Sequence, residues 1–253
     1  MQALKFELSG KTAFFKKPDV NSYIYFTYGN IHKIALLGIL GGILGLDGYM
    51  FQQDKIYPEF YSKLSDLMIS IVPKSKEGFI SKKVQTFNNS VGYASKEQGG
   101  NLIINEQWLE EPKWDIYILL EDKEYIDELK DRLLFNKYKY IPYLGKNDHF
   151  ASIKYVEVVN LEELQDVIRI DSLFIKKYFS ILNSNEDDSS NLNQILNNVS
   201  DNKKWKYEEK LPIRLGKNTN QYELESFVFT NMKVKNKDKI SLYSYKDKTL
   251  FFF

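Results

Sequence analysis

The sequence predicts an α+β fold: a ferredoxin-like domain with a hairpin insertion, followed by a β-rich extension. Three observations lead to this prediction. The strand and helix signals follow the order strand, helix, strand, strand, helix, strand. A long segment without helical period interrupts that series, and strand patterns return in the C-terminal part of the chain.

The first three elements are a strand, a helix and a second strand. Leu4, Phe6 and Leu8 alternate with charged residues, which is the period of a half-buried strand. Gly10 predicts a bulge or bend, after which residues 12–18 resume the extended pattern. An apolar helix is expected over 34–46, a second helical piece over 56–67 and a strand over 67–73, ended by a proline.

The other half of the series contains the insertion. Residues 74–113 have Gly and Asn punctuation with scattered lysines and aromatics, which predicts a long projecting hairpin. A strand follows over 114–120, and an amphipathic helix lies within 121–138. The loop 141–150 leads into a strand over 152–160. This order is also that of the RNA-recognition motif.

The chain therefore divides into a domain over 1–160, with its insertion at about 74–113, and a second part over 161–253. The second part begins with an acidic segment and the polar run 183–204, interpreted as a crossing. It ends in strands over 222–230, 239–245 and 249–253.

Composition excludes several classes of function. The absence of cysteine excludes disulfides and thiolate metal sites, and two histidines leave little for a zinc site, so no metal or other cofactor is expected. The apolar run 34–46 is shorter than the ~20 residues of a membrane-spanning helix. We expect a cytoplasmic protein that does not enter a membrane.

Charge is distributed unevenly although the net charge is only +1. Residues 1–46 hold five lysines against two acids, residues 157–202 hold nine acids against three bases, and residues 203–253 hold twelve bases against six acids. An anionic partner could contact the two basic segments.

The apolar helix carries glycine at positions 38, 41, 42 and 45, which share one face. Each glycine weakens the helix, so we expect another backbone, from a sheet or an extended ligand, to lie on this face. The glycine-rich phosphate-binding motifs G-x-x-x-x-G-K-[ST] and G-x-G-x-x-G are both absent from the sequence, which argues against nucleotide binding. Lys33 with the first helical turn predicts an anion site, while His32 serves either that site or simply the helix cap.

Two blocks of sequence resemble a known family. They are "FFKKPDVNSYIYFTYGNIHKIALLGILGGILGL", at 14–46, and "YIPYLGKNDHF", at 140–150, with the hairpin insertion between them. This combination resembles the fifth family of CRISPR-associated proteins, RAMP-superfamily subunits of the type I Cascade surveillance complex, and is most similar to the type I-B branch. The resemblance covers the first ~160 residues; the C-terminal part fits more loosely.

The resemblance implies a non-catalytic RNA-binding subunit with an RNA-recognition-motif-like fold and a thumb hairpin. Such a subunit holds the 5′ handle of the CRISPR RNA (crRNA), contacts the Cascade large subunit and the first backbone subunit, and meets target DNA indirectly through the complex. The matching positions of this chain are Tyr28, Asn30, His32, Lys33, Gly145, Lys146, Asn147 and His149. The family often has Arg-Ser-Glu-Cys where this chain has residues 146–149.

Two lysine pairs add candidates on chemical grounds. Lys16 and Lys17 follow two phenylalanines, and Lys82 and Lys83 lie between two others. RNA with unstacked bases is held by aromatic stacking and by lysines on its phosphates, so these pairs are predicted to bind RNA.

Two alternatives stay open. One is a metal-independent endoribonuclease that processes precursor crRNA, with His32, His149 and Tyr28 as acid or base and a lysine stabilising the phosphate. The other is a protein-only scaffold subunit whose basic segments contact acidic neighbours.

Overall fold

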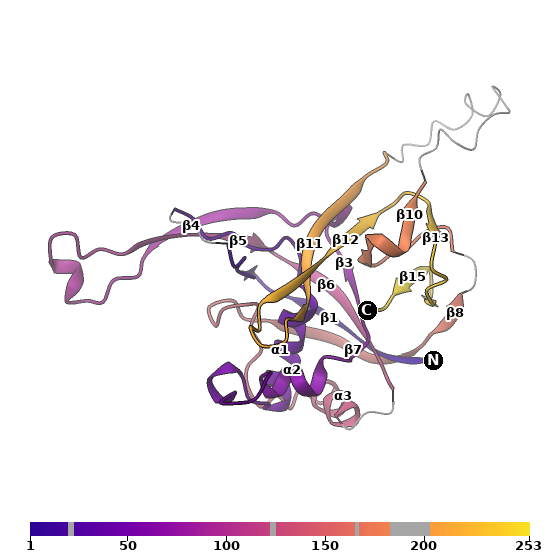
Figure 1. Cartoon of the computed structure of the whole chain (residues 1–253), viewed down its shortest axis with the longest axis horizontal. Coiled ribbons are helices and arrows are strands. Elements are labelled where there is room, and N and C mark those ends of the chain that lie inside the picture. The colour runs from indigo at the N-terminus through magenta and orange to yellow at the C-terminus, as the bar shows by residue number, and fades with distance from the viewer. Residues whose placement is uncertain (20–22, 122–124, 165–166, 183–202) are drawn as a thin grey trace.

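The computed structural model describes residues 1–19, 23–121, 125–164, 167–182 and 203–253 (Figure 1). These residues form a mixed α/β structure that is mostly sheet with few helices. The predicted polar crossing over 183–204 lies outside the described residues except for its last two positions. None of the described helices is long and apolar enough to span a bilayer.

A four-stranded antiparallel sheet lies at the centre, in the order β3-β6-β1-β7. Its strands are β1 (Gln2–Ser9), β3 (Ile69–Pro73), β6 (Lys113–Leu119) and β7 (Ser152–Asn160). The alternation predicted for β1 is observed, with Leu4, Phe6 and Leu8 fully buried in the larger core. The other face of the sheet is covered as well, because Ala3 packs in a second buried cluster with Tyr117.

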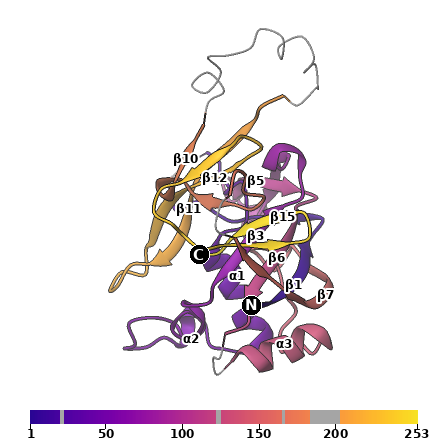
Figure 2. The ribbon, with the colours of Figure 1, turned by 90° about the vertical axis from the view of Figure 1, so that its right-hand side faces the viewer.

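Three α-helices accompany the sheet: α1 (Lys33–Leu44), α2 (Glu59–Leu64) and α3 (Ile126–Leu134). Helix α2 is shorter than the predicted 56–67, because Pro58 occupies its N-cap in an extended conformation. Helix α3 is also shorter than its segment; Ile126, Leu129 and Leu133 are buried as the amphipathic spacing predicts, while Leu134 is 37% exposed. Both α2 and α3 lie at the end of the molecule away from β10 (Figure 2).

The segment predicted to form a hairpin contains β4 (Lys82–Asn88) and β5 (Ile103–Glu110), paired antiparallel and projecting from the body (Figure 1). The short strand β2 (Thr12–Ala13) adds to β5. The prediction of a strand through residue 18 is wrong, because the backbone N–H of Phe14 leaves β5 and donates to the carbonyl of Leu144. Gly10 lies in a turn after β1, with its N–H donating to Pro112.

The described residues of the C-terminal part add eight strands: β8 (Glu162–Leu164), β9 (Phe174–Ile175), β10 (Phe179–Ile181), β11 (Lys206–Leu215), β12 (Tyr222–Thr230), β13 (Val234–Asn236), β14 (Leu242–Tyr245) and β15 (Lys248–Phe251). They form sheets in the orders β11-β12-β9, β15-β14-β8 and β10-β13. Phe174, Phe227 and Phe251 belong to the same buried cluster as Phe6 and Ile34. The two parts of the chain therefore share one core.

Four short 3-10 helices complete the described elements. They are η1 (Tyr49–Phe51), η2 (Lys76–Gly78), η3 (Ala94–Lys96) and η4 (Lys176–Tyr178). Of these, η3 lies between the hairpin strands, and η1 lies between α1 and α2.

Candidate functional site

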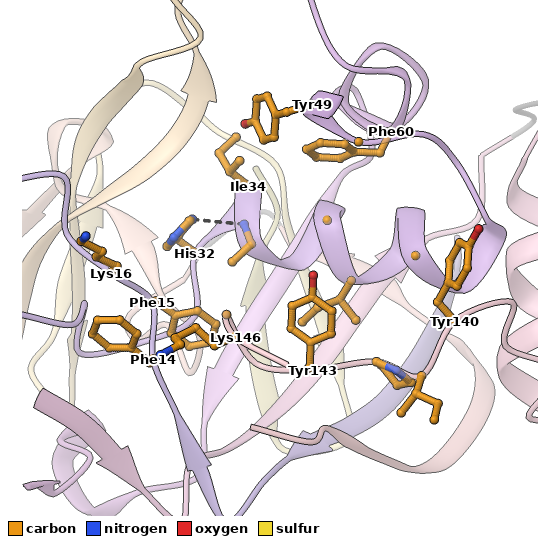
Figure 3. A pocket seen from close by; sticks show the side chains of 18 of the residues that line it. Phe14, Phe15, Lys16, His32, Ile34, Tyr49, Phe60, Tyr140, Tyr143 and Lys146 are labelled. Atoms are coloured by element: carbon orange, nitrogen blue, oxygen red, sulfur yellow. Dashed lines mark hydrogen bonds between the residues drawn. The ribbon is translucent and has the colours of Figure 1, made fainter. Parts of the chain in front are cut away.

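A cavity of about 740 Å³ opens along one side of α1 and is called the helix cavity below (Figure 3). Its lining comes from α1, the segment 14–16, the loop 140–146 and single residues of η1, α2, β5 and β12. Segments far apart in the sequence therefore build one site next to the root of the hairpin.

Two glycines of α1 line the cavity. A Cβ added to Gly38 or Gly42 would meet no atom within 4 Å, so the helix backbone is open there. The other two glycines of this face have different roles. A Cβ on Gly41 would lie 2.5 Å from Cβ of Phe60, so α2 packs closely at that position. Gly45 is the C-cap, with a left-handed φ of 82°.

These contacts correct the expectation of a sheet lying on the whole glycine face. Within the described part of the chain, an α2 side chain contacts one glycine and the lysine side chain of position 139 contacts another. The remaining two, Gly38 and Gly42, are open. The loop 139–143 crosses the helix end, where the N–H of Tyr140 donates to the carbonyl of Gly42.

Aromatic side chains surround the cavity. Phe14 and Phe15 are buried at one end, each with 3% of its surface exposed. Tyr140 and Tyr143 stand on the loop beside the helix, with 59% and 46% of their surfaces exposed (Figure 3). Tyr49 lies across the helix from them.

Two lysines reach the end of the cavity near Phe14. Nζ of Lys16 lies 3.8 Å from the centre of the Tyr25 ring, and among the described residues this lysine has no carboxylate partner. Nζ of Lys146 lies 3.1 Å from Oε1 of Glu106, which is 5% exposed. The structure thus brings together two predicted RNA-binding lysines that are distant in sequence.

Glu106 is a cavity residue that sequence reasoning missed. Its Oε2 accepts a hydrogen bond of 2.8 Å from Nε1 of Trp108, and both of its oxygens bond to Lys146. The alternation of β5 was the available signal, since Glu106 and Trp108 share one face of the strand.

His32 is the N-cap of α1 and is 3% exposed. Its Nδ1 accepts a hydrogen bond of 3.2 Å from the N–H of Ala35, while the rings of Phe15, Tyr28 and Tyr222 pack against it. Burial lowers the pKa of His32 to about 3, so the imidazole is neutral. His32 thus serves as a cap, with one side lining the cavity.

Asn30 and Tyr28, the other two matching positions of the first block, are buried. Asn30 has no exposed surface, accepts from Nε1 of Trp114 at 2.9 Å and donates to the carbonyl of Gly78. Tyr28 is 3% exposed, and burial raises its pKa to about 12. Both side chains therefore stabilise the fold around the cavity.

Lys33 does not form the predicted anion site with the helix start. Only 7% of the surface of Lys33 is exposed, and its Nζ donates a hydrogen bond to the carbonyl oxygen of Phe253 at 3.0 Å. The cation thus points to the C-terminal strands, where it satisfies a buried backbone oxygen.

Lys17 and Lys82 gather instead around Glu209 of β11. Nζ of Lys17 lies 3.0 Å from Oε1 of Glu209, and Oε2 accepts from the N–H of Gly29 at 2.8 Å. Burial lowers the pKa of Lys82, with Glu209 opposing the shift and Lys17 adding to it. Glu209 thus pairs with Lys17 and lies close enough to Lys82 to affect its pKa.

Lys83 lies on the opposite face of β4 from Lys82. Nζ is 3.7 Å from Oε1 of Glu110 and 6.0 Å from the centre of the Trp108 ring. It does not line the helix cavity.

The second predicted block has mixed roles. Gly145 has a φ of 94°, and a Cβ there would lie 1.9 Å from the carbonyl oxygen of Phe14, so only glycine fits. Asn147 is exposed. His149 is 1% exposed, with Nδ1 2.6 Å from Oγ1 of Thr12, and burial with nearby Lys146 lowers its pKa.

The chain is similar to known proteins in its fold and not in its sequence. No protein-family profile and no curated protein match the sequence. The chain superposes on a chain of a "CRISPR RNA-guided surveillance complex" with a TM-score of 0.51 and 8% identity, over 92% of this chain and 91% of that one. At this identity the likeness shows a shared fold.

Two further solved structures have TM-scores just under 0.5. A CRISPR protein from Archaeoglobus fulgidus gives 0.49 with 11% identity, over 99% of this chain and 98% of that one. A chain of the type III-B Cmr-beta complex bound to cognate target RNA and AMPPnP gives 0.48 with 12% identity, over 93% and 86%. These neighbours are CRISPR-associated proteins.

Proposed function

We propose that this chain is a non-catalytic RNA-binding subunit of a type I Cascade complex in antiviral defence, and that it belongs to the fifth CRISPR-associated family near the type I-B branch. It holds the 5′ handle of the crRNA, contacts the large subunit and the first backbone subunit, and meets target DNA indirectly. The observation that carries this proposal is the meeting of Lys16 and Lys146 at one end of the aromatic helix cavity.

The strand arrangement supports the fold part of the proposal. The four central strands follow one another along the chain as β1, β3, β6 and β7. In the sheet they lie side by side in the order β3-β6-β1-β7, so the second strand of the chain is at one edge and the fourth is at the other. This is the order expected of a ferredoxin-like or RNA-recognition-motif-like domain. The projecting hairpin of β4 and β5 corresponds to the thumb, and the shared fold with a CRISPR complex chain agrees with this.

The chemistry of the cavity supports the RNA part. Ammonium groups contact phosphates, and aromatic rings with exposed faces stack on unpaired bases. Lys16 and Lys146 supply the first contact, and Tyr140 and Tyr143 supply the second. The other lysines of the prediction do not line the cavity: Lys17 and Lys83 are in ion pairs, and Lys82 is half-buried.

The state of the histidines supports a non-catalytic role. A general acid or base works best with a pKa near the working pH and with access to the reacting group. The pKa of His32 is lowered to about 3, and its Nδ1 is occupied by the helix cap. His149 is buried against Trp108, with its pKa also lowered.

Exposed apolar side chains support contacts with other subunits. Tyr49, Met50 and Phe51 of η1 are 51%, 89% and 58% exposed. Contiguous exposed apolar surface is typical of protein interfaces. We assign this surface to a neighbouring Cascade subunit.

The decisive experiment is purification of the tagged chain from its native cells, with sequencing of the bound RNA and identification of the bound proteins. We expect a repeat-derived 5′ RNA end, several protein subunits, and RNA crosslinks to the peptides of Lys16 and Lys146. Lys16→Ala and Lys146→Ala should reduce the crosslinks, while Lys55→Ala, in the exposed loop before α2, should not.

Three results would overturn parts of the proposal. A lone monomer without RNA would contradict the assignment as a whole. Bound subunits without any RNA crosslink would favour the protein-only scaffold. Specific cleavage of repeat RNA by the purified chain, abolished by His149→Gln, would favour the endoribonuclease.

A further inference from the structure

Packing among the described residues does not explain why positions 38 and 42 are glycine. Both lie in regular helix, and a Cβ on either would meet no atom within 4 Å. Alanine would fit at both positions and is the better helix former. The open space above the helix is therefore available to a ligand that approaches the backbone closely.

The walls of this space fit a flat, apolar ring. Tyr143 and Tyr140 stand beside the helix (Figure 3). Ile141 and Pro142 of the same loop also line the cavity. A volume of about 740 Å³ exceeds that of one nucleobase with its sugar. Aromatic side chains with exposed faces bind unstacked bases regardless of sequence.

Charge decides between a nucleotide and an apolar protein side chain. The cationic lining of the cavity consists of Lys16 and Lys146, both at the end near Phe14. A nucleotide has the matching pattern, with a flat ring and an anionic phosphate one sugar away. Lys146 is already paired with Glu106, but an apolar side chain of a protein would leave the ammonium group of Lys16 without an anionic counterpart.

We propose that the helix cavity receives one unstacked nucleobase of the bound RNA. The base lies against the backbone of α1 at Gly38 and Gly42, beside Tyr143, and its phosphate contacts Lys16 and Lys146. Because the oxygens of Glu106 already bond to Lys146 and Trp108, the cavity holds the base by stacking and shape. This inference rests on the proposed RNA-binding function and adds a base pocket to it.

The test fills the cavity from the helix side. Gly38→Leu and Gly42→Leu place a side chain in the open space, whereas Gly92→Leu, in the loop of the hairpin, adds the same bulk where no atom lies within 4 Å and outside the cavity. Each full-length variant is titrated with fluorescent oligo(A), and with oligo(A) that carries one abasic site at each position in turn. Thermal melting shows that the variants are folded.

We expect the leucine variants in the helix to bind oligo(A) about tenfold more weakly, the loss of one stacked base. Gly92→Leu should bind like the unaltered chain. One abasic position should weaken binding to the unaltered chain by about the same factor as the leucine substitutions do. In Gly42→Leu the same abasic oligonucleotide should bind no more weakly than intact oligo(A), because both changes remove the same contact.

The outcomes separate the two proposals. Unchanged oligo(A) affinity in both helix variants, with RNA still bound, would overturn the base pocket and leave the RNA-binding function standing. No binding of oligo(A) by the unaltered chain would count against the RNA-binding function itself. If a leucine variant melts below the unaltered chain, Gly38→Ala and Gly42→Ala replace it, with an expected loss of affinity smaller than the loss of a whole stacked base.

Discussion

Nε1 of Trp114 donates a hydrogen bond of 2.9 Å to Oδ1 of Asn30, and neither residue has any exposed surface. The bond joins β6 of the central sheet to the segment that precedes α1. Nδ2 of Asn30 also donates to the carbonyl of Gly78 at 3.3 Å. This one amide therefore connects the sheet, the start of α1 and the approach to the hairpin.

Asn30→Leu should lower the free energy of unfolding by about 1–3 kcal/mol, because it leaves the indole N–H of Trp114 buried without a partner. Urea denaturation measures the change. Asn147→Ala is the control, because its side chain is exposed and its removal should change stability by less than ~0.5 kcal/mol. Equal stability of Asn30→Leu and the unaltered chain would mean that the hydrogen bond contributes nothing.

Adjacent glycines of α1 should respond in opposite directions. Gly42→Ala should raise the free energy of unfolding by about 1 kcal/mol, because alanine is the better helix former and its Cβ meets no atom. Gly41→Ala should lower it by about 1–3 kcal/mol, because its Cβ would lie 2.5 Å from that of Phe60. Chemical denaturation of the two variants side by side tests this; the same sign for both would contradict the packing of α2 against α1.

Local pattern was sufficient to predict several elements. The alternation around Leu4, Phe6 and Leu8 predicts β1, since a strand with one buried face leaves that period in the sequence. The spacing of Ile126, Leu129 and Leu133 predicts α3 for the same kind of reason. Both signals lie within a few residues of the element that they describe.

The environment of the lysines could not be predicted in this way. Lys33 contacts the carbonyl of Phe253, 220 positions away, and Lys17 contacts Glu209 on β11. The local sequence around a lysine is the same whether its side chain faces solvent or contacts a distant strand. Contacts with C-terminal residues hold Lys33 and Lys17 away from the cavity, whereas Lys16 and Lys146 line it beside Tyr25 and Glu106.

Lys16 and Lys146 should differ in stability but agree in RNA binding. Lys146→Met removes the ammonium from Glu106, which is 5% exposed, and should lower the free energy of unfolding by about 1–3 kcal/mol. Lys16→Met, which breaks no ion pair, should change it by less than ~0.5 kcal/mol.

Both variants should bind oligo(A) more weakly, with a shallower dependence of affinity on salt, because each loses one phosphate contact. Fluorescence anisotropy at several salt concentrations measures this slope. An unchanged slope in Lys16→Met would show that Lys16 does not contact the phosphate.

His32 should make stability depend on pH. Burial lowers its pKa in the folded chain to about 3, against 6.5 for the free side chain, so between these values the unfolded chain binds more protons than the folded one. The free energy of unfolding should therefore rise with pH across this window, and fall toward acid by up to about 1.4 kcal/mol per pH unit from this one group.

His32→Asn keeps an oxygen that can accept the hydrogen bond from Ala35 but does not titrate, so its curve should be flatter by that slope. His149→Gln separates the contribution of the other histidine, whose pKa is lowered as well. Denaturation of the three proteins between about pH 4 and pH 7 gives the slopes. Parallel curves for His32→Asn and the unaltered chain would mean that His32 can be protonated in the folded state, and this would restore it as a candidate general acid beside the cavity.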